Sequence, residues 1–145
     1  MFVIFFNSIF QTVAIRPNRP LFSLKISIMN IAIVGSRSFK DYELLKSEIK
    51  KFISEKSLET VKIVSGGAVG ADTLAEKFAE EKGFETLIFL PEREKYGRNA
   101  CLVRNTQIVE AADVVFAFWN GISKGTKDSI KKAEKMNKEL FIINF

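Results

Sequence analysis

The sequence predicts an α/β fold in which an open parallel sheet of about five strands carries helices on both faces. Three observations support this prediction. From Asn30 to the C-terminus, short apolar runs alternate with longer amphipathic runs. The apolar runs are mostly continuous, as strands buried on both faces require. Turns rich in glycine or polar residues follow these runs, and 145 residues are enough for one domain of ordinary size.

Five apolar runs are predicted to be strands, and Pro91 ends the third of them. Because a helical run separates each strand from the next, the strands are expected to be parallel and joined by right-handed crossovers. The predicted strand ranges are 31–34, 61–64, 84–90, 113–118 and 140–143.

Four amphipathic runs are predicted to be helices, at about 41–54, 70–82, 99–111 and 126–137. Asp41 is suited to cap the first helix, and Gly83 is suited to end the second. The third helix is expected to bury apolar residues that include Leu102, Val103, Ile108 and Val109. Residues 92–98 are polar and without periodicity, so they are expected to form a mobile loop.

Residues 1–28 differ in composition from the rest of the chain. Their apolar opening is too short to span a membrane and lacks the basic start of a signal peptide. The simplest interpretation is an extension upstream of a natural start at Met29, followed by one ligand-binding domain over residues 29–145. The alternatives are an extra strand or an arm used in oligomer formation.

Composition excludes several classes of function. The chain has no histidine and a single cysteine, Cys101, so it lacks the commonest metal ligand, a thiolate metal site and an internal disulfide. We therefore expect a cytoplasmic protein without a metal site. Arg16, Arg19 and Lys25 supply +3 of the net charge of +5, which leaves +2 for residues 29–145. That balance argues against nucleic acid as a partner, and no membrane association is expected.

The run from Ser65 to Asp72 is the most informative turn, because it places three glycines between a strand and a helix. Glycine adopts positive φ at little steric cost and lets a ligand approach the backbone. The first turn of the following helix offers N–H groups without acceptors, which favour an anion. We interpret the turn, with Ser65, Gly66, Gly67 and Gly70, as a phosphate-binding element. The alternative is a corner that only joins strand to helix.

Other polar residues are expected at the same edge, where ligands bind in open parallel sheets. Arg37 and Arg104 could neutralise phosphate, Asp72 could hold a ribose hydroxyl, and Trp119 could stack on a base. Each also has a purely structural alternative: a surface arginine, a capping carboxylate, a solvated helix face or a packed indole. The full set of additional candidates is Gly35, Ser36, Arg37, Asp72, Arg98, Asn99, Arg104, Asn105, Trp119, Ser123, Gly125 and Thr126.

These motifs resemble the YspA/YpsA-related branch of the SLOG superfamily. The resemblance rests on Ile31–Arg37, Ser65–Asp72, Arg104-Asn105, and Trp119 with Ser123, Gly125 and Thr126, and it covers residues 29–145. It implies a Rossmann-like domain that binds nucleotides or nucleotide-derived ligands, with no certain cofactor. It also leaves a homo-oligomer open.

The superfamily includes the lonely-guy phosphoribohydrolases and the DNA-processing protein DprA. In the hydrolases an arginine and a glutamate carry catalysis. Arg104 matches the arginine, but the glutamate position falls on Ser129, so only Asp72 or Asp128 could replace that carboxylate. The leading hypothesis is nucleotide binding or sensing. The alternatives are an N-glycosidic hydrolase that uses Arg104 and Asp72, and single-stranded nucleic-acid binding of the DprA kind.

Overall fold

The computed structural model describes residues 2–4, 13–15 and 28–145. Two short strands, β1 (Phe2–Ile4) and β2 (Val13–Ile15), pair antiparallel. Most of residues 1–28 lie outside the described residues, so the prediction that Met29 is the natural start stays a prediction.

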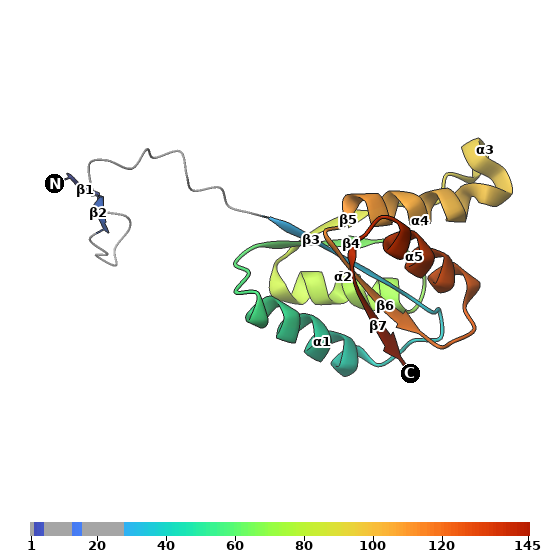
Figure 1. The fold of residues 1–145 in the computed structure, drawn as a ribbon, viewed down its shortest axis with the longest axis horizontal. Coiled ribbons are helices and arrows are strands. Elements are labelled where there is room, and N and C mark those ends of the chain that lie inside the picture. The colour runs from blue at the N-terminus through green and yellow to red at the C-terminus, as the bar shows by residue number, and fades with distance from the viewer. Residues whose placement is uncertain (1, 5–12, 16–27) are drawn as a thin grey trace.

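The predicted parallel sheet is confirmed (Figure 1). Its strands lie in the order β5-β4-β3-β6-β7, and every neighbouring pair is parallel. The chain therefore adds β4 and β5 on one side of β3, and then crosses back to add β6 and β7 on the other side. The strands are β3 (Met29–Gly35), β4 (Val61–Ser65), β5 (Glu85–Ile88), β6 (Val114–Trp119) and β7 (Glu139–Asn144).

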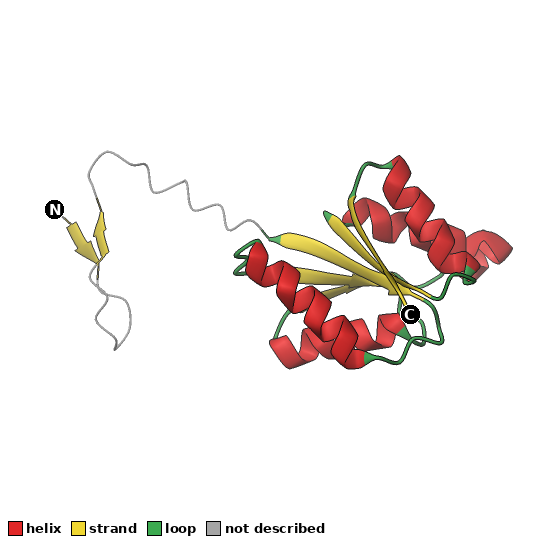
Figure 2. Ribbon diagram, turned by 60° about the horizontal axis from the view of Figure 1, so that its bottom comes forward, coloured by secondary structure: helices red, strands yellow, loops and turns green. Residues whose placement is uncertain are grey.

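Helices cover both faces of the sheet, which completes a Rossmann-like architecture (Figure 2). On one face, α1 (Tyr42–Glu55) and α2 (Ala71–Lys82) pack against Ile31 and Ile33. On the other face, α4 (Ala100–Ala111) and α5 (Lys124–Lys135) pack against Ala32 and Val34. Alternate residues of β3 thus face opposite cores, which explains why its apolar run is continuous.

The caps of the first two helices follow the sequence prediction. The Asp41 carboxylate accepts a hydrogen bond from the Leu44 N–H at 2.9 Å and caps α1. Gly83 adopts the left-handed conformation, φ 70°, and its N–H donates to the Ala79 and Glu80 carbonyls at the end of α2. No helix in the described part of the chain is long and apolar enough to cross a membrane.

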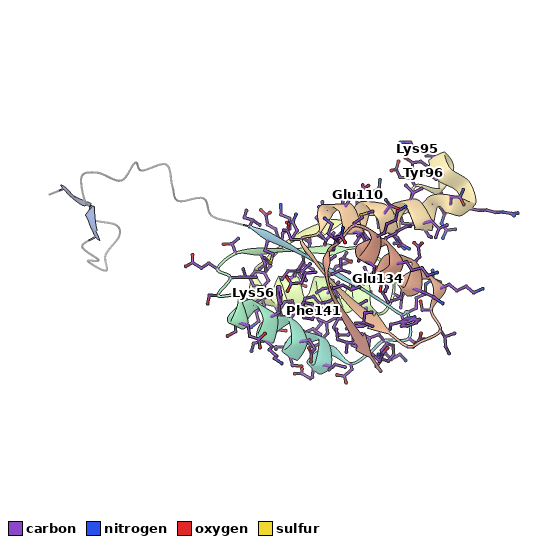
Figure 3. The ribbon with its side chains drawn as sticks, viewed as in Figure 1. Lys56, Lys95, Tyr96, Glu110, Glu134 and Phe141 are labelled. Carbon is purple, nitrogen blue, oxygen red and sulfur yellow. The ribbon has the colours of Figure 1, made fainter. Side chains whose placement is uncertain are left out.

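The prediction of a loop over residues 92–98 is wrong. This segment forms the short helix α3 (Arg93–Tyr96) and a 3₁₀ turn (Gly97–Asn99), and Lys95 and Tyr96 lie near its tip (Figure 3). The Tyr96 N–H donates to the Glu92 carbonyl at 3.0 Å and closes the turn. A helix of one turn is too short to show an amphipathic period, so the sequence gives no signal for it.

The buried face of α4 also differs from the prediction. Leu102 is 47% exposed, whereas Asn105 is only 6% exposed. Asn105 can occupy an inward position because its side-chain amide makes hydrogen bonds with Arg104, Gly125 and Asp128. In addition, α5 begins at Lys124 rather than 126, because the Ser123 hydroxyl accepts from the Thr126 N–H at 3.4 Å.

Candidate functional site

A polar hollow of about 440 Å³ opens at the carboxyl ends of β3 and β6, where the strand order reverses. We call it the main hollow. Three turns and the start of α4 enclose it, so it draws on segments far apart in the sequence. Its lining is Val34, Gly35, Ser36, Arg37, Ser38, Ala68, Asp72, Cys101, Arg104, Asn105, Asn120, Ser123, Gly125, Thr126 and Ser129.

Ser36 joins two of these turns. Its side chain is almost fully buried, its N–H donates to the Phe118 carbonyl at 2.9 Å, and its hydroxyl accepts from the Asn120 N–H at 3.2 Å. Arg37, the next residue, is exposed and lines the main hollow. The turn after β3 therefore uses its serine for structure and presents its arginine to the site.

The glycines of the turn after β4 have different roles. A Cβ on Gly70 would lie 2.5 Å from the Ser36 carbonyl oxygen, and Gly70 has φ 94°. Gly70 therefore lets this turn contact the turn after β3 directly. A Cβ on Gly66 would instead lie 2.7 Å from Arg104 Nη1 and 2.9 Å from Asp72 Oδ2. Gly66 thus makes room for the two charged groups of the site.

Asp72 lies in the first turn of α2 and is 7% exposed. Its carboxylate accepts a hydrogen bond from the Ala68 N–H at 3.1 Å. Burial raises the pKa of Asp72 to about 6, although the Ala68 N–H and the Arg104 guanidinium both lower it. The side chain therefore carries a proton for part of the time near pH 6 and can donate or accept a hydrogen bond there.

This raised pKa predicts a pH-dependent stability. A carboxyl whose pKa rises from 3.8 to about 6 on folding stabilises the fold fully below pH 4 and loses that contribution as the pH rises through 6. At about 1.4 kcal/mol per pKa unit, the loss is about 3 kcal/mol. Asp72→Asn cannot ionise. Relative to the native chain, its free energy of unfolding should therefore increase by up to about 3 kcal/mol between pH 4 and pH 7.

Urea unfolding of both proteins at pH 4, 5, 6 and 7 measures this difference directly. Carboxyls common to both chains contribute equally and cancel. A difference that stays constant over this range would contradict the raised pKa of Asp72.

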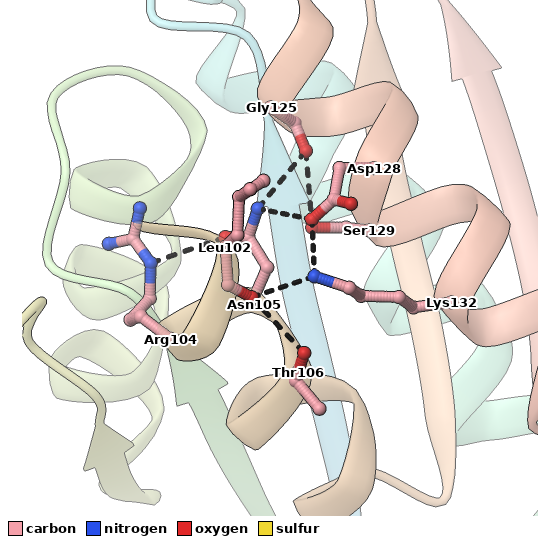
Figure 4. A network of polar contacts seen from close by, with 8 residues as sticks. All are labelled: Leu102, Arg104, Asn105, Thr106, Gly125, Asp128, Ser129 and Lys132. Atoms are coloured by element: carbon pink, nitrogen blue, oxygen red, sulfur yellow. Dashed lines mark hydrogen bonds and ion pairs between the residues drawn. The ribbon is translucent and has the colours of Figure 1, made fainter. Parts of the chain in front are cut away.

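A polar network joins α4 to α5 beside the main hollow (Figure 4). Arg104 Nε donates to Asn105 Oδ1 at 3.2 Å, and Arg104 Nη1 donates to the Gly66 carbonyl at 2.6 Å. Asn105 Nδ2 lies 3.4 Å from the Gly125 carbonyl and 3.0 Å from Asp128 Oδ2. Lys132 Nζ pairs with the same Asp128 oxygen at 2.6 Å. Asp128 is therefore engaged in holding Asn105 and does not line the main hollow.

Residues 29–96, which run from β3 to α3, match the sequence model of the family described as the YspA, cpYpsA-related SLOG family. The matched residues include the first two turns of the site, so this part of the chain is similar to that family, whereas α4 and α5 follow the matched region. No curated protein matches the sequence.

Solved structures share the fold of this chain. DprA from Streptococcus pneumoniae is 20% identical with a TM-score of 0.66, covering 83% of this chain and 52% of that protein. DprA from Helicobacter pylori, which binds single-stranded DNA, is 21% identical with a TM-score of 0.60, over 79% of this chain and 64% of that protein. TM1055 is 20% identical with a TM-score of 0.57, over 78% and 72%. The chain spans about half the length of the first of these proteins.

The structure brings together many of the residues that the sequence predicts for the site. Nine of them line the main hollow: Gly35, Ser36, Arg37, Asp72, Arg104, Asn105, Ser123, Gly125 and Thr126. Gly66 and Gly67 line a smaller adjoining hollow with Arg37 and Arg104.

The other predicted residues lie elsewhere. Ser65 is fully buried, and its hydroxyl accepts from the Gly67 N–H at 3.2 Å. Gly70 packs against the turn after β3, and Arg98 and Asn99 are exposed beside α3 without lining either hollow. Trp119 ends β6, packs against the core, and donates its indole N–H to the Ser123 carbonyl at 3.1 Å.

Sequence reasoning did not select six residues that line the main hollow: Val34, Ser38, Ala68, Cys101, Asn120 and Ser129. Asn120 had a usable signal, since an asparagine before a glycine commonly caps a turn. Its side-chain oxygen accepts from the Ile122 and Ser123 N–H groups at 3.0 and 2.9 Å. Ser129 and Cys101 line the hollow because they lie on the faces of α5 and α4 that point toward it. The type of residue does not indicate which face of a helix points toward a hollow.

Proposed function

We propose that the main hollow binds a nucleotide or a nucleotide-derived ligand. The observation that carries this proposal is the combination, in one hollow of about 440 Å³, of two arginines with the first turn of α5. The volume is in the range of small-molecule sites, about 300–1,000 Å³. The position, at the reversal of strand order in an open parallel sheet, is where such folds bind nucleotides.

Phosphate binding is supported by charge and by backbone geometry. The N–H groups of Lys124 and Gly125 lie in the first turn of α5 and have no acceptor within the helix. The positive end of the helix dipole adds to the attraction for an anion. Arg104 uses two of its five N–H groups in its hydrogen bonds to Gly66 and Asn105, so others remain to contact phosphate.

The sugar and base have candidate partners as well. Among the described residues, Asp72 is the one carboxyl that lines the main hollow, and it can accept from a ribose hydroxyl. Ser38, Asn120 and Ser123 supply further hydrogen-bonding groups around the same space. Trp119 packs against the core and lines neither hollow, so base stacking on it would require the indole to move.

One observation favours a second function, hydrolysis of the N-glycosidic bond. Asp72 is a buried carboxyl in the hollow with a pKa of about 6, which is suitable for acid–base work near neutral pH. Water would add across the bond between base and ribose, releasing free base and the ribose phosphate. Against this, Ser129 occupies the position at which the resembling hydrolases have glutamate, and a hydroxyl cannot stabilise positive charge as a carboxylate does.

The experiment is a thermal-shift series on the full chain with AMP, GMP, CMP and UMP at pH 7. A ligand at 100 times its Kd stabilises the fold by about 2.7 kcal/mol. For a chain of this size that is a rise in Tm of roughly 5–10 °C. Chromatography of each mixture then reports whether the nucleotide stays intact. An intact, stabilising nucleotide supports binding, and release of free base would establish hydrolysis instead.

Absence of a shift with every nucleotide would contradict the proposal. A single-stranded oligonucleotide is the next probe in that case, because two proteins of similar fold are DprA. Binding through phosphates would weaken steeply as the salt concentration rises.

A further inference from the structure

A second hollow adjoins the main one, on the side of the turn after β4. Its volume is about 270 Å³, and we call it the side hollow. The two hollows share Arg37, Ala68, Cys101 and Arg104. The remaining lining of the side hollow is Gly66, Gly67, Val69, Pro91 and Arg93.

The side hollow has a strongly positive lining. It combines three arginines, Arg37, Arg93 and Arg104, and no carboxylate lines it among the residues that the structure describes. None of the ion pairs within the described residues involves these arginines. Three guanidinium groups around one space repel one another, and an anion placed between them relieves that repulsion.

The floor of the side hollow lets a ligand approach closely. Gly66 and Gly67 have no side chains, and a Cβ on Gly66 would collide with the Arg104 guanidinium. Arg104 stands at the wall between the two hollows, fixed there by its hydrogen bonds to the Gly66 carbonyl and Asn105. An extended ligand that passes from one hollow to the other would therefore cross both shared arginines.

We propose that the side hollow is a second phosphate subsite, and that the ligand is a nucleoside 5′-diphosphate, either free or joined through its diphosphate to a second sugar. This inference rests on the proposed function. The nucleoside and first phosphate occupy the main hollow. The second phosphate lies between Arg37, Arg104 and Arg93 in the side hollow, where guanidinium groups form short, charge-assisted hydrogen bonds with phosphate oxygens.

Arg93 distinguishes the two subsites because it lines the side hollow and does not line the main hollow. It is the first residue of α3, the short helix that was not predicted from the sequence. The position of α3 therefore determines the position of the Arg93 backbone. The exposed Lys95 lies two residues further on and lines neither hollow, so it is a matched control for a change of charge on this segment.

The test is calorimetric titration of the full chain with AMP, ADP and ADP-ribose at fixed ionic strength. We expect ADP to bind at least about 10-fold more tightly than AMP, the effect of one charge-assisted contact. Arg93→Ala should remove most of that advantage and leave the Kd of AMP unchanged. Lys95→Ala should preserve the ratio of the ADP and AMP affinities. ADP-ribose that binds more tightly than ADP identifies the ligand as a conjugate, and the reverse order identifies a free diphosphate.

Each other outcome has a distinct meaning. Equal binding of AMP and ADP would overturn the second subsite but leave nucleotide binding in place. Equal losses in Arg93→Ala and Lys95→Ala would assign the effect to general charge and also overturn it. No binding of AMP, ADP or ADP-ribose, together with no thermal shift for GMP, CMP or UMP, would overturn the proposed function itself. An oligothymidylate that binds more tightly than ADP and depends on Arg93 would assign the side hollow to a nucleic-acid strand instead.

Discussion

Replacing Arg104 with alanine is expected to weaken AMP binding about 10- to 100-fold at pH 7. The guanidinium stands between the two hollows and retains donors for a phosphate after its hydrogen bonds to Gly66 and Asn105. Hydrogen bonds to a charged group contribute about 1.5–3 kcal/mol each, and about 1.4 kcal/mol changes a Kd tenfold. Calorimetric titration of the native and variant chains measures the change.

Two further variants distinguish the loss of a contact with phosphate from destabilisation of the fold. Arg98 is exposed and lines neither hollow, so Arg98→Ala should bind AMP as the native chain does. Arg37 lines both hollows and is exposed, so Arg37→Ala should weaken binding with little change in Tm. If Arg37→Ala and Arg104→Ala both kept the native Kd, the proposed phosphate site would be wrong.

Gly70→Ala is expected to lower the free energy of unfolding by at least about 3 kcal/mol. The added Cβ would lie 2.5 Å from the Ser36 carbonyl oxygen and 2.7 Å from the Arg37 Cα. Both contacts are with backbone, so no side chain can rotate away, and the φ of 94° adds strain for any residue other than glycine. Urea unfolding at pH 7 measures the loss.

Gly83→Ala is the matched control. Gly83 has a similar positive φ of 70°, but a Cβ there would meet no atom within 4 Å. That variant should lose only about 1–2 kcal/mol, the strain of a left-handed residue. Equal losses in the two variants would show that the close approach of the two turns contributes nothing to stability.

Most of the fold could be predicted because strands buried on both faces leave an unambiguous pattern. Ile31–Val34 is apolar at every position, since alternate residues face opposite cores. The prediction failed where tertiary contacts override local pattern. Asn105 replaces Leu102 on the inner face of α4 because Arg104, Gly125 and Asp128 satisfy its amide. No rule based on hydrophobicity alone places an asparagine inside.

The sequence predicted where the candidate site lies better than it predicted the role of each residue in it. The turns that follow β3, β4 and β6 were expected at one edge, and they do lie there. However, a glycine that makes room for charged side chains and a glycine required for contact between two turns look alike in the sequence. Gly66 and Gly70 are such a pair, and only the positions of Arg104 and Ser36 distinguish them. Arg93 was missed because the helix that carries it has a single turn.

The hydrogen bonds that join these turns to one another have an entropic consequence. Ser36 ties the turn after β3 to that after β6, and Arg104 ties α4 to the glycine turn, through hydrogen bonds within the protein itself. These bonds hold the backbone around both hollows without any contact from a ligand. Ligand binding therefore does not have to order a flexible loop, and it avoids the loss of conformational entropy that would reduce the binding free energy. Most of the free energy of a small ligand's polar contacts can thus contribute to its affinity.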